Sequence, residues 1–353
     1  MKLEKDNIRN KIQSYKKQIN LDTNDYNAYY NLANSLYSNL QLEESIHYYN
    51  KCLKINPNFE KARNEIHIAQ KEKKDLIIYL TTHNTQQQSS NLIIKCNQKL
   101  NKIKYKLDFK KNISENFIYT YTNNILSILD HELMDTEFNL TQIYRDGMKQ
   151  YDCNRHFQVF NQYKVIPENC FECYKVLIQT DSVVELIKLF FLFNSINSKI
   201  NLTRKCMIEL RKYVDGKYKA FIYCVGLSEA NETLNILNPI LDKTVNKNIS
   251  RFIKRGCSEF SLAYPDYGEI NPSSKNFLKY NFDWKVKEDI IDKKISENRL
   301  NTPIKSNILN QISLSDALII KNWIIYAKLI GDDSYKKFNY HNLKSEYLEK
   351  IIN

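Results

Sequence analysis

The stretch KCMIELRKYVDGKYKAFIYC, residues 205–224, decides the fold of the second half of the chain. Two runs rich in apolar and aromatic residues flank Asp215 and Gly216. An Asp-Gly pair between such runs is a strong signal for a β-hairpin, because glycine tolerates the positive φ that a tight turn needs. The sequence therefore predicts two antiparallel strands, over residues 204–212 and 217–224.

Two further strands and two helices surround this hairpin in the sequence. Residues 173–179 and 250–259 are β-rich runs, while residues 182–196 and 228–244 carry apolar residues at helical spacing. The resulting order, β-α-β-β-α-β, is that of the ferredoxin-like unit. We therefore expect an α+β protein in which residues 170–262 form one antiparallel sheet, with its strands in the order fourth, first, third, second.

The N-terminal residues have a longer period. Residues 26–59 read YNAYYNLANSLYSNLQLEESIHYYNKCLKINPNF. This stretch resembles a tetratricopeptide repeat (TPR), a helix–turn–helix unit with large, small and proline residues at fixed places. Leu32 and Pro57 match the family pattern, and Tyr29 stands where tryptophan is usual. The resemblance implies helical hairpins at the N-terminus.

The same period extends on both sides of this repeat. Subtracting one repeat length maps Tyr49 onto Tyr15, so residues 5–21 are predicted to be the second helix of a preceding repeat. Residues 60–80 supply a further helix with apolar residues at core spacing. The resemblance therefore covers residues 5–80.

Two interpretations of these helices stay open. The family resemblance implies a concave surface that binds a partner protein or peptide, and Tyr29, Asn31, Asn34 and Tyr37 are the candidate partner-binding residues. The helices could equally support the next domain, because a single repeat cannot bury its own apolar face.

The chain is expected to contain five segments. The predicted boundaries are 1–82 for the TPR-like helices, 83–95 for a polar linker, 96–169 for a helical connector, 170–262 for the ferredoxin-like domain and 263–353 for a mostly helical C-terminal segment.

Two short Cys/His pairs come before the first predicted strand. Cys153 and His156 lie three positions apart, as do Cys170 and Cys173. Tetrahedral zinc needs four nitrogen or sulfur donors at one point, and two close pairs joined by a loop can provide them. The spacing predicts a structural zinc site. The alternative is that the cysteines are buried as small hydrophobic residues.

Cys257 is the alternative metal ligand. In the predicted topology the last strand lies beside the first, so Cys257 should fall near Cys173. Lys254 and Arg255 precede it and could bind an anion or favour a reactive thiol. A thiol- or metal-dependent enzyme centred on Cys257 is therefore one hypothesis, although the six glycines exclude a Rossmann fingerprint and a P-loop.

The chain is basic, with 52 Lys and Arg against 40 Asp and Glu and a net charge of +12. A basic balance is typical of nucleic-acid-binding proteins, and residues 217–224 partly resemble the third-strand octet of RNA-recognition motifs. The candidate nucleic-acid-binding residues are Lys217, Lys219, Phe221, Tyr223, Lys254 and Arg255. The abundance of Asn, Lys, Ile and Tyr also fits AT-rich coding bias, which leaves the meaning of the charge open.

The sequence as a whole favours a partner-binding or adaptor protein that carries a structural zinc site. Nucleic-acid binding through the basic sheet is the alternative function, and thiol- or metal-dependent catalysis is the second alternative. The N-terminus is charged and no apolar run approaches the length of a membrane span, so we expect a cytoplasmic protein.

Overall fold

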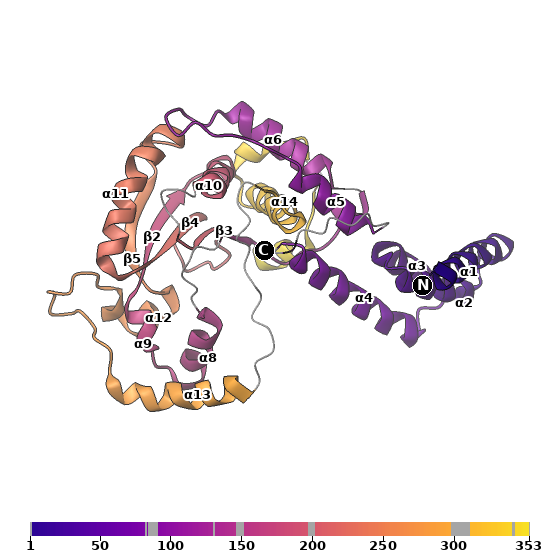
Figure 1. The fold of residues 1–353 in the computed structure, drawn as a ribbon, viewed down its shortest axis with the longest axis horizontal. Coiled ribbons are helices and arrows are strands. Elements are labelled where there is room, and N and C mark those ends of the chain that lie inside the picture. The colour runs from indigo at the N-terminus through magenta and orange to yellow at the C-terminus, as the bar shows by residue number, and fades with distance from the viewer. Residues whose placement is uncertain are drawn as a thin grey trace. The chain divides into compact units, whose positions relative to one another are not determined.

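The computed structural model describes residues 2–81, 83, 91–129, 131–145, 152–196, 202–297, 311–340 and 343–352. Figure 1 traces the chain by residue number. The chain groups into two compact units. Unit 1 consists of Met1–Ile103, Ser127–Phe138 and Ile312–Leu318, and unit 2 consists of Lys104–Leu126, Asn139–Gln311 and Ile319–Asn353.

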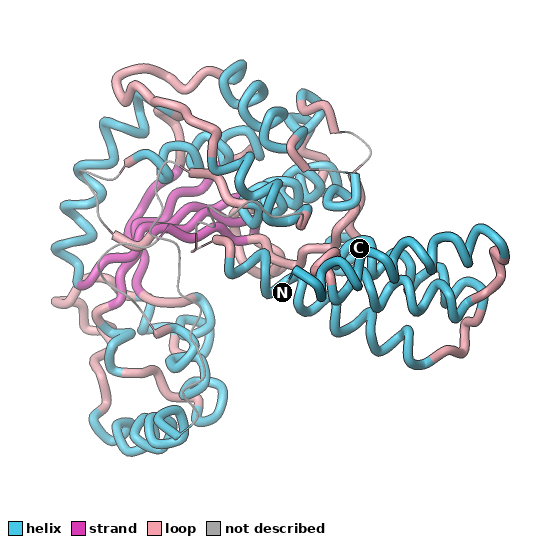
Figure 2. The backbone as a smooth tube through the Cα atoms, turned by 45° about the vertical axis from the view of Figure 1, so that its right-hand side comes forward, coloured by secondary structure: helices cyan, strands magenta, loops and turns pink. Residues whose placement is uncertain are grey.

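Unit 1 begins with four antiparallel helices, which appear as paired cyan coils in Figure 2: α1 (Lys2–Leu21), α2 (Tyr26–Ser38), α3 (Leu42–Ile55) and α4 (Glu60–Tyr79). Helix α2 starts after Asp25 because the Asp25 carboxylate accepts a hydrogen bond from the backbone N of Ala28 at 3.0 Å. Leu32, Tyr49 and Cys52 are fully buried between the helices. The predicted helical hairpins are therefore confirmed.

A capped helix follows in unit 1. Helix α5 (Leu92–Asn101) begins after Asn91, whose side chain accepts from Ile93 N and donates to Leu40 O at 2.6 Å. The predicted linker over 83–95 therefore ends inside a helix, and most of its other residues lie outside the described part of the chain. The short helix α7 (His131–Met134) also belongs to unit 1.

Unit 2 contains a five-stranded antiparallel sheet, the magenta strands of Figure 2. Its strands lie in the order β1-β3-β4-β2-β5. Their bounds are β1 (Gln142–Arg145), β2 (Cys173–Thr180), β3 (Arg204–Ile208), β4 (Tyr218–Val225) and β5 (Ser250–Arg255). The hairpin between β3 and β4 is present as predicted, with Gly216 at φ 80°.

Two helices cover one face of this sheet. These are α10 (Val183–Ser195), which follows β2, and α11 (Gly226–Thr244), which follows β4 (Figure 1). The Cys224 thiol lies 3.6 Å from the Thr233 hydroxyl of α11, and Arg145 Nε donates to Asn194 Oδ1 of α10 at 2.7 Å. Even-numbered residues of β4 therefore face the helices, and its odd-numbered residues face the other side.

The remaining helices complete unit 2. They are α6 (Glu115–Ser127), α8 (Cys153–Tyr163), α9 (Glu168–Phe171), α12 (Ser258–Ala263), η1 (Pro265–Gly268), η2 (Phe282–Trp284), α13 (Lys285–Glu297), α14 (Leu314–Leu329), which starts in unit 1, η3 (Asp333–Lys337) and α15 (Glu346–Ile352). Helix α8 is tied to α13 by Arg155, which donates to Glu288 at 2.6 Å and to Asp292 at 2.7 Å. No helix in the described ranges is long and apolar enough to cross a membrane.

The structure differs from the sequence prediction at both edges of the sheet. Strand β1 lies in the segment 96–169, for which the sequence predicted only helices. At the other edge, β5 ends at Arg255 instead of continuing to residue 259. The chain turns at Gly256, where φ is 52°, and enters α12 at Ser258. The apolar pattern alone could not indicate this turn.

Replacing Gly256 with alanine should destabilise unit 2 by about 2–5 kcal/mol. The positive φ alone costs roughly 1–2 kcal/mol for a residue with a Cβ, and steric overlap in a packed site adds about 1–3 kcal/mol. A Cβ at Gly256 would overlap the ring and hydroxyl of Tyr267. Urea-induced unfolding measures the loss.

The matched control is Gly331→Ala. Gly331 also has a positive φ, 77°, but an added Cβ there would meet no atom within 4 Å. It should lose only the backbone contribution of roughly 1–2 kcal/mol. Equal losses for the two variants would mean that Tyr267 does not constrain the turn.

Candidate functional site

The strand register gathers lysines and aromatic residues on the sheet face that α10 and α11 leave uncovered. Lys175 of β2 pairs with Tyr223 of β4 on one side and with Lys254 of β5 on the other. Lys205 of β3 pairs in the same way with Phe221 of β4 and with Tyr144 of β1. Residues opposite each other in neighbouring strands share a face.

This face forms the floor of a pocket of about 400 Å³. Helices α8, α9 and α12 contribute its walls, and basic residues outnumber acidic ones five to two in the lining. The lining residues are Thr141, Gln142, Tyr144, Cys153, His156, Phe157, Cys170, Cys173, Lys175, Leu177, Lys205, Met207, Ile208, Glu209, Leu210, Arg211, Lys219, Phe221, Tyr223, Lys254, Gly256, Cys257, Ser258, Glu259 and Phe260.

Lys175 is a buried cation at the centre of the floor. Its Nζ donates a hydrogen bond to Cys257 Sγ at 3.2 Å and lies 5.1 Å from the centre of the Tyr223 ring. Burial lowers the pKa of Lys175, but the sulfur atoms of Cys257 and Cys173 outweigh burial, so that the net direction of its pKa is upward. The hydrogen bond to Cys257 therefore favours the charged form of Lys175.

Lys205 lies farther along the floor, and its pKa moves in the opposite direction. Burial, followed by the charge of Lys175, lowers the pKa of Lys205 to about 7, against weaker opposing effects of Cys257, Cys153 and Glu209. Its Nζ lies 4.9 Å from the Phe221 ring centre and 5.4 Å from that of Tyr144. The Lys205 ammonium group therefore contacts two aromatic rings in addition to Gln142 Oε1.

Lys254 is the third lysine of this group. Its Nζ donates to Ser258 Oγ at 2.7 Å. Burial lowers its pKa, and the charges of Lys175 and Lys219 lower it further. Among the described residues, Lys175, Lys205 and Lys254 have no acidic side chain within ion-pair distance.

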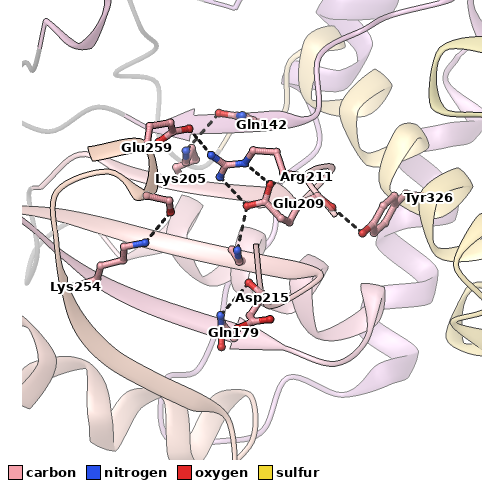
Figure 3. A network of polar contacts seen from close by, with 11 residues as sticks. Gln142, Gln179, Lys205, Glu209, Arg211, Asp215, Lys254, Glu259 and Tyr326 are labelled. Atoms are coloured by element: carbon pink, nitrogen blue, oxygen red, sulfur yellow. Dashed lines mark hydrogen bonds and ion pairs between the residues drawn. The ribbon is translucent and has the colours of Figure 1, made fainter. Parts of the chain in front are cut away.

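The other two cations of the pocket, Lys219 and Arg211, are already paired with Glu209. The Glu209 carboxylate accepts from Lys219 Nζ at 3.0 Å and from Arg211 Nε at 2.7 Å. Figure 3 shows Arg211 between Glu209 and its second partner, Glu259. Burial alone would raise the pKa of Glu209, but the hydrogen bonds from Arg211 and Lys219 lower it to about 2.

A backbone hydrogen bond joins the segment that carries Cys173 to the segment that carries Cys257. Gly256 N donates to Cys173 O at 2.7 Å, which brings the turn after β5 beside the start of β2. Cys257 consequently lies near Cys173, as the predicted topology required, and the Lys175 ammonium bridges toward it. Burial raises the pKa of Cys173 to about 12, so this thiol stays protonated at neutral pH.

All five predicted metal ligands line the pocket: Cys153, His156, Cys170, Cys173 and Cys257. Within the described ranges, however, no group of three or more His, Cys, Asp or Glu side chains is arranged to hold a metal ion. Burial lowers the pKa of His156 and raises that of Cys170. The zinc site therefore stays a prediction.

The predicted nucleic-acid-binding residues do not share one surface. Lys219, Phe221, Tyr223 and Lys254 line the pocket, whereas exposed Lys217 does not. Arg255 is buried elsewhere, and it donates to Phe171 O at 3.2 Å and to Leu278 O at 3.0 Å. Because Tyr223 is only 7% exposed, its ring is not open for base stacking.

Sequence reasoning missed the residues that give the pocket its charge pattern: Gln142, Tyr144, Lys175, Lys205, Glu209 and Arg211. One signal was available in the run CYKVLI, residues 173–178, because Lys175 interrupts an otherwise apolar stretch of a central strand. A lysine that must be buried is rare unless it has a partner or a function.

The candidate partner-binding residues of unit 1 have different environments. Tyr29 is 8% exposed and belongs to the helical core, while Asn34 accepts a hydrogen bond from Tyr49 at 2.6 Å. Asn31 is half-buried. Tyr37 is also half-buried, and a hydrogen bond with Glu72, followed by burial, raises its pKa to about 12. Their role in partner binding stays a prediction.

Comparison with protein families identifies the N-terminal helices. The family model of the tetratricopeptide repeat matches residues 26–59, which are α2, α3 and their flanks. This match confirms the resemblance inferred from Tyr29, Leu32 and Pro57, and it supports a protein-interaction module. Comparisons with curated proteins and with solved structures found no match.

Replacing Glu209 with glutamine should destabilise the protein by about 3 kcal/mol, because Lys219 then stays buried without a counter-charge. The pKa of Glu209 is depressed in the folded state, so its stabilisation is present above the unfolded pKa and is lost as the pH falls toward 2. The difference in stability between wild type and the variant should therefore shrink from pH 5 to pH 2, as measured by urea unfolding.

Glu259→Gln serves as the control. Its carboxylate also pairs with Arg211 but is about a third exposed. Solvent-screened ion pairs contribute roughly 0–1 kcal/mol, so this variant should be nearly neutral. If Glu259→Gln costs as much as Glu209→Gln, burial does not determine the strength of the network.

Proposed function

We propose that unit 2 binds a small organic anion in the pocket on its sheet. One observation carries the proposal: Lys175, Lys205 and Lys254 face one pocket, and among the described residues none of them has an acidic partner within ion-pair distance. A buried charge is costly unless it is compensated. An anionic ligand would supply the compensation.

The size and lining of the pocket support a small ligand over a polymer. A volume of about 400 Å³ lies within the range of ligand pockets in proteins. The rings of Tyr144, Phe221 and Tyr223 offer an apolar wall beside the lysines. Such a combination suits a compound that has an anionic group and a short carbon skeleton.

We also propose that the sheet is a ferredoxin-like unit with one added strand. The order of β5, β2, β4 and β3 and their antiparallel pairing support this assignment, as do the crossover helices α10 and α11 on a common face. On this proposal β1 extends the sheet beyond β3 and adds Tyr144 and Gln142 to the site.

The anion proposal is tested with inorganic phosphate, citrate and 2-oxoglutarate. At least one of these should raise the thermal unfolding midpoint of the full chain, and added salt should weaken its binding, because the contacts are ionic. Lys175→Met should weaken binding about tenfold, which is the loss expected for one charge-assisted hydrogen bond. Calorimetric titration measures the affinity.

Lys247→Met is the matched control, because Lys247 is exposed and lies outside the pocket lining. It should bind the anion as the wild type does. Anion binding that is equal in Lys175→Met and Lys247→Met contradicts the proposal. Tight binding of a short single-stranded RNA that needs Lys217 would favour the nucleic-acid alternative instead.

For unit 1 we propose a partner-binding role, which would make the chain an adaptor. The match to the tetratricopeptide repeat supports it. The side chains of Asn31 and Tyr37 are only half-buried, so a partner can contact them. In an affinity capture, the Asn31→Ala, Tyr37→Ala double variant should therefore fail to retain a partner that the full wild-type chain retains. A partner that both proteins retain equally would exclude this surface, provided that both have the same helical content by circular dichroism.

A further inference from the structure

We infer that Lys205 is an amine nucleophile that forms an imine with a small aldehyde or ketone carrying a carboxylate or phosphate group. The inference rests on the proposed function, because the pocket must bind the anionic group. It adds a reaction, a nucleophile and a substrate class to that function. The geometry of the five basic side chains leads to it.

The contrast between Lys205 and Lys219 identifies the nucleophile. Both lysines line the pocket, but Lys219 Nζ is committed to Glu209 at 3.0 Å. Lys205 Nζ is 3.4 Å from Gln142 Oε1, near the outer limit of a hydrogen bond, and otherwise lies against the rings of Tyr144 and Phe221. Its nitrogen therefore faces the pocket without a strong polar partner among the described residues.

The surroundings of Lys205 also make its neutral form accessible. Burial and the Lys175 charge lower its pKa to about 7, against opposing effects of Cys257, Cys153 and Glu209. An amine can attack a carbonyl only when its lone pair is not protonated. Desolvation and a neighbouring cation are the means by which catalytic lysines reach this state.

The other two lysines that have no acidic partner within ion-pair distance among the described residues provide the anchor for the anionic group. Lys175 and Lys254 are directly opposite each other in the register of β2 and β5. Both side chains reach the same pocket as Lys205, which extends from β3. A carboxylate or phosphate bound at Lys175 and Lys254 would leave the carbonyl carbon of a short compound on the Lys205 side.

Tyr144 is the positioning residue for the Lys205 amine. Its hydroxyl donates to Gln142 Oε1 at 2.9 Å, and Lys205 Nζ contacts the same oxygen. Burial raises the pKa of Tyr144 to about 12, so the hydroxyl keeps its proton at neutral pH. Gln142, which Tyr144 and Lys205 share as a partner, thus links the Tyr144 hydroxyl to the attacking amine.

The reaction conserves atoms and needs no oxidant. The Lys205 lone pair forms a bond to the carbonyl carbon, the π electrons move to oxygen, and one proton passes from the nitrogen to that oxygen to give a carbinolamine. The nitrogen lone pair then forms a double bond to carbon as the hydroxyl group leaves with the second nitrogen proton as water. One amine and one carbonyl compound yield one imine and one water molecule.

Reductive trapping of the full chain tests this inference. Sodium cyanoborohydride reduces an imine to a stable amine, and peptide mass mapping then identifies the labelled lysine. The probes are glyoxylate, which carries a carboxylate, glycolaldehyde phosphate, which carries a phosphate, and neutral glycolaldehyde. Lys205 should be labelled about tenfold faster by at least one anionic probe than by glycolaldehyde, the factor expected for one charged contact. The faster anionic probe reveals which group the pocket prefers.

Three variants sharpen the test. Lys205→Arg keeps a cation but cannot form an imine, so it should lose the specific label while still binding inorganic anions. Lys175→Met should reduce labelling by the anionic probes more than labelling by glycolaldehyde, so that their advantage is lost. Lys247→Met should label like the wild type.

The outcomes separate this inference from the proposed anion site. Anion binding in the thermal assay without a label on Lys205 overturns the imine inference and leaves the anion site intact. An adduct on Cys257 in place of Lys205, or equal rates for neutral and anionic probes, also overturns it. If no anion binds and no lysine is selectively labelled, both proposals fall.

Discussion

The candidate site depends on the alternation of side chains across β2 and β4. In β4, Ala220, Ile222 and Cys224 pack under the helices, while Phe221 and Tyr223 face the pocket. A slip of one residue would exchange these two sets. The apolar set fixes the register, because burial on the helical side drives folding. The positions of Lys175 and its neighbours are therefore a consequence of how the opposite face packs.

The fold could be read from the sequence wherever a local signal existed. The Asp215-Gly216 turn and the repeat over residues 26–59 both depend on residues close together in the chain, and both were predicted correctly. Strand β1 could not be predicted, because it is four residues long and its pairing with β3 joins segments far apart in sequence. The turn at Gly256 could not be predicted for a similar reason, because Tyr267, which packs against this glycine, is not adjacent to it in sequence.

The candidate site was harder to predict than the fold. The predicted cysteines line the pocket, but the sequence offered no reason to group them with Lys175 and Lys205, which lie on different strands. Their shared pocket follows only from the strand order. The net charge of +12 was also a poor guide, because it does not distinguish a lysine neutralised by Glu209 from one that faces a cavity.

The hydrogen bond between Gly256 N and Cys173 O has a consequence for recognising this site in other chains. It joins two short sequence motifs, Cys-Tyr-Lys at 173–175 and Gly-Cys at 256–257, that are separated by two helices and three strands. The glycine is required by its φ of 52° and by Tyr267, and the lysine reaches the second cysteine. A distant homologue whose surface residues differ widely could thus still be detected by these two motifs. The chain between them would have to form a helix-covered antiparallel sheet.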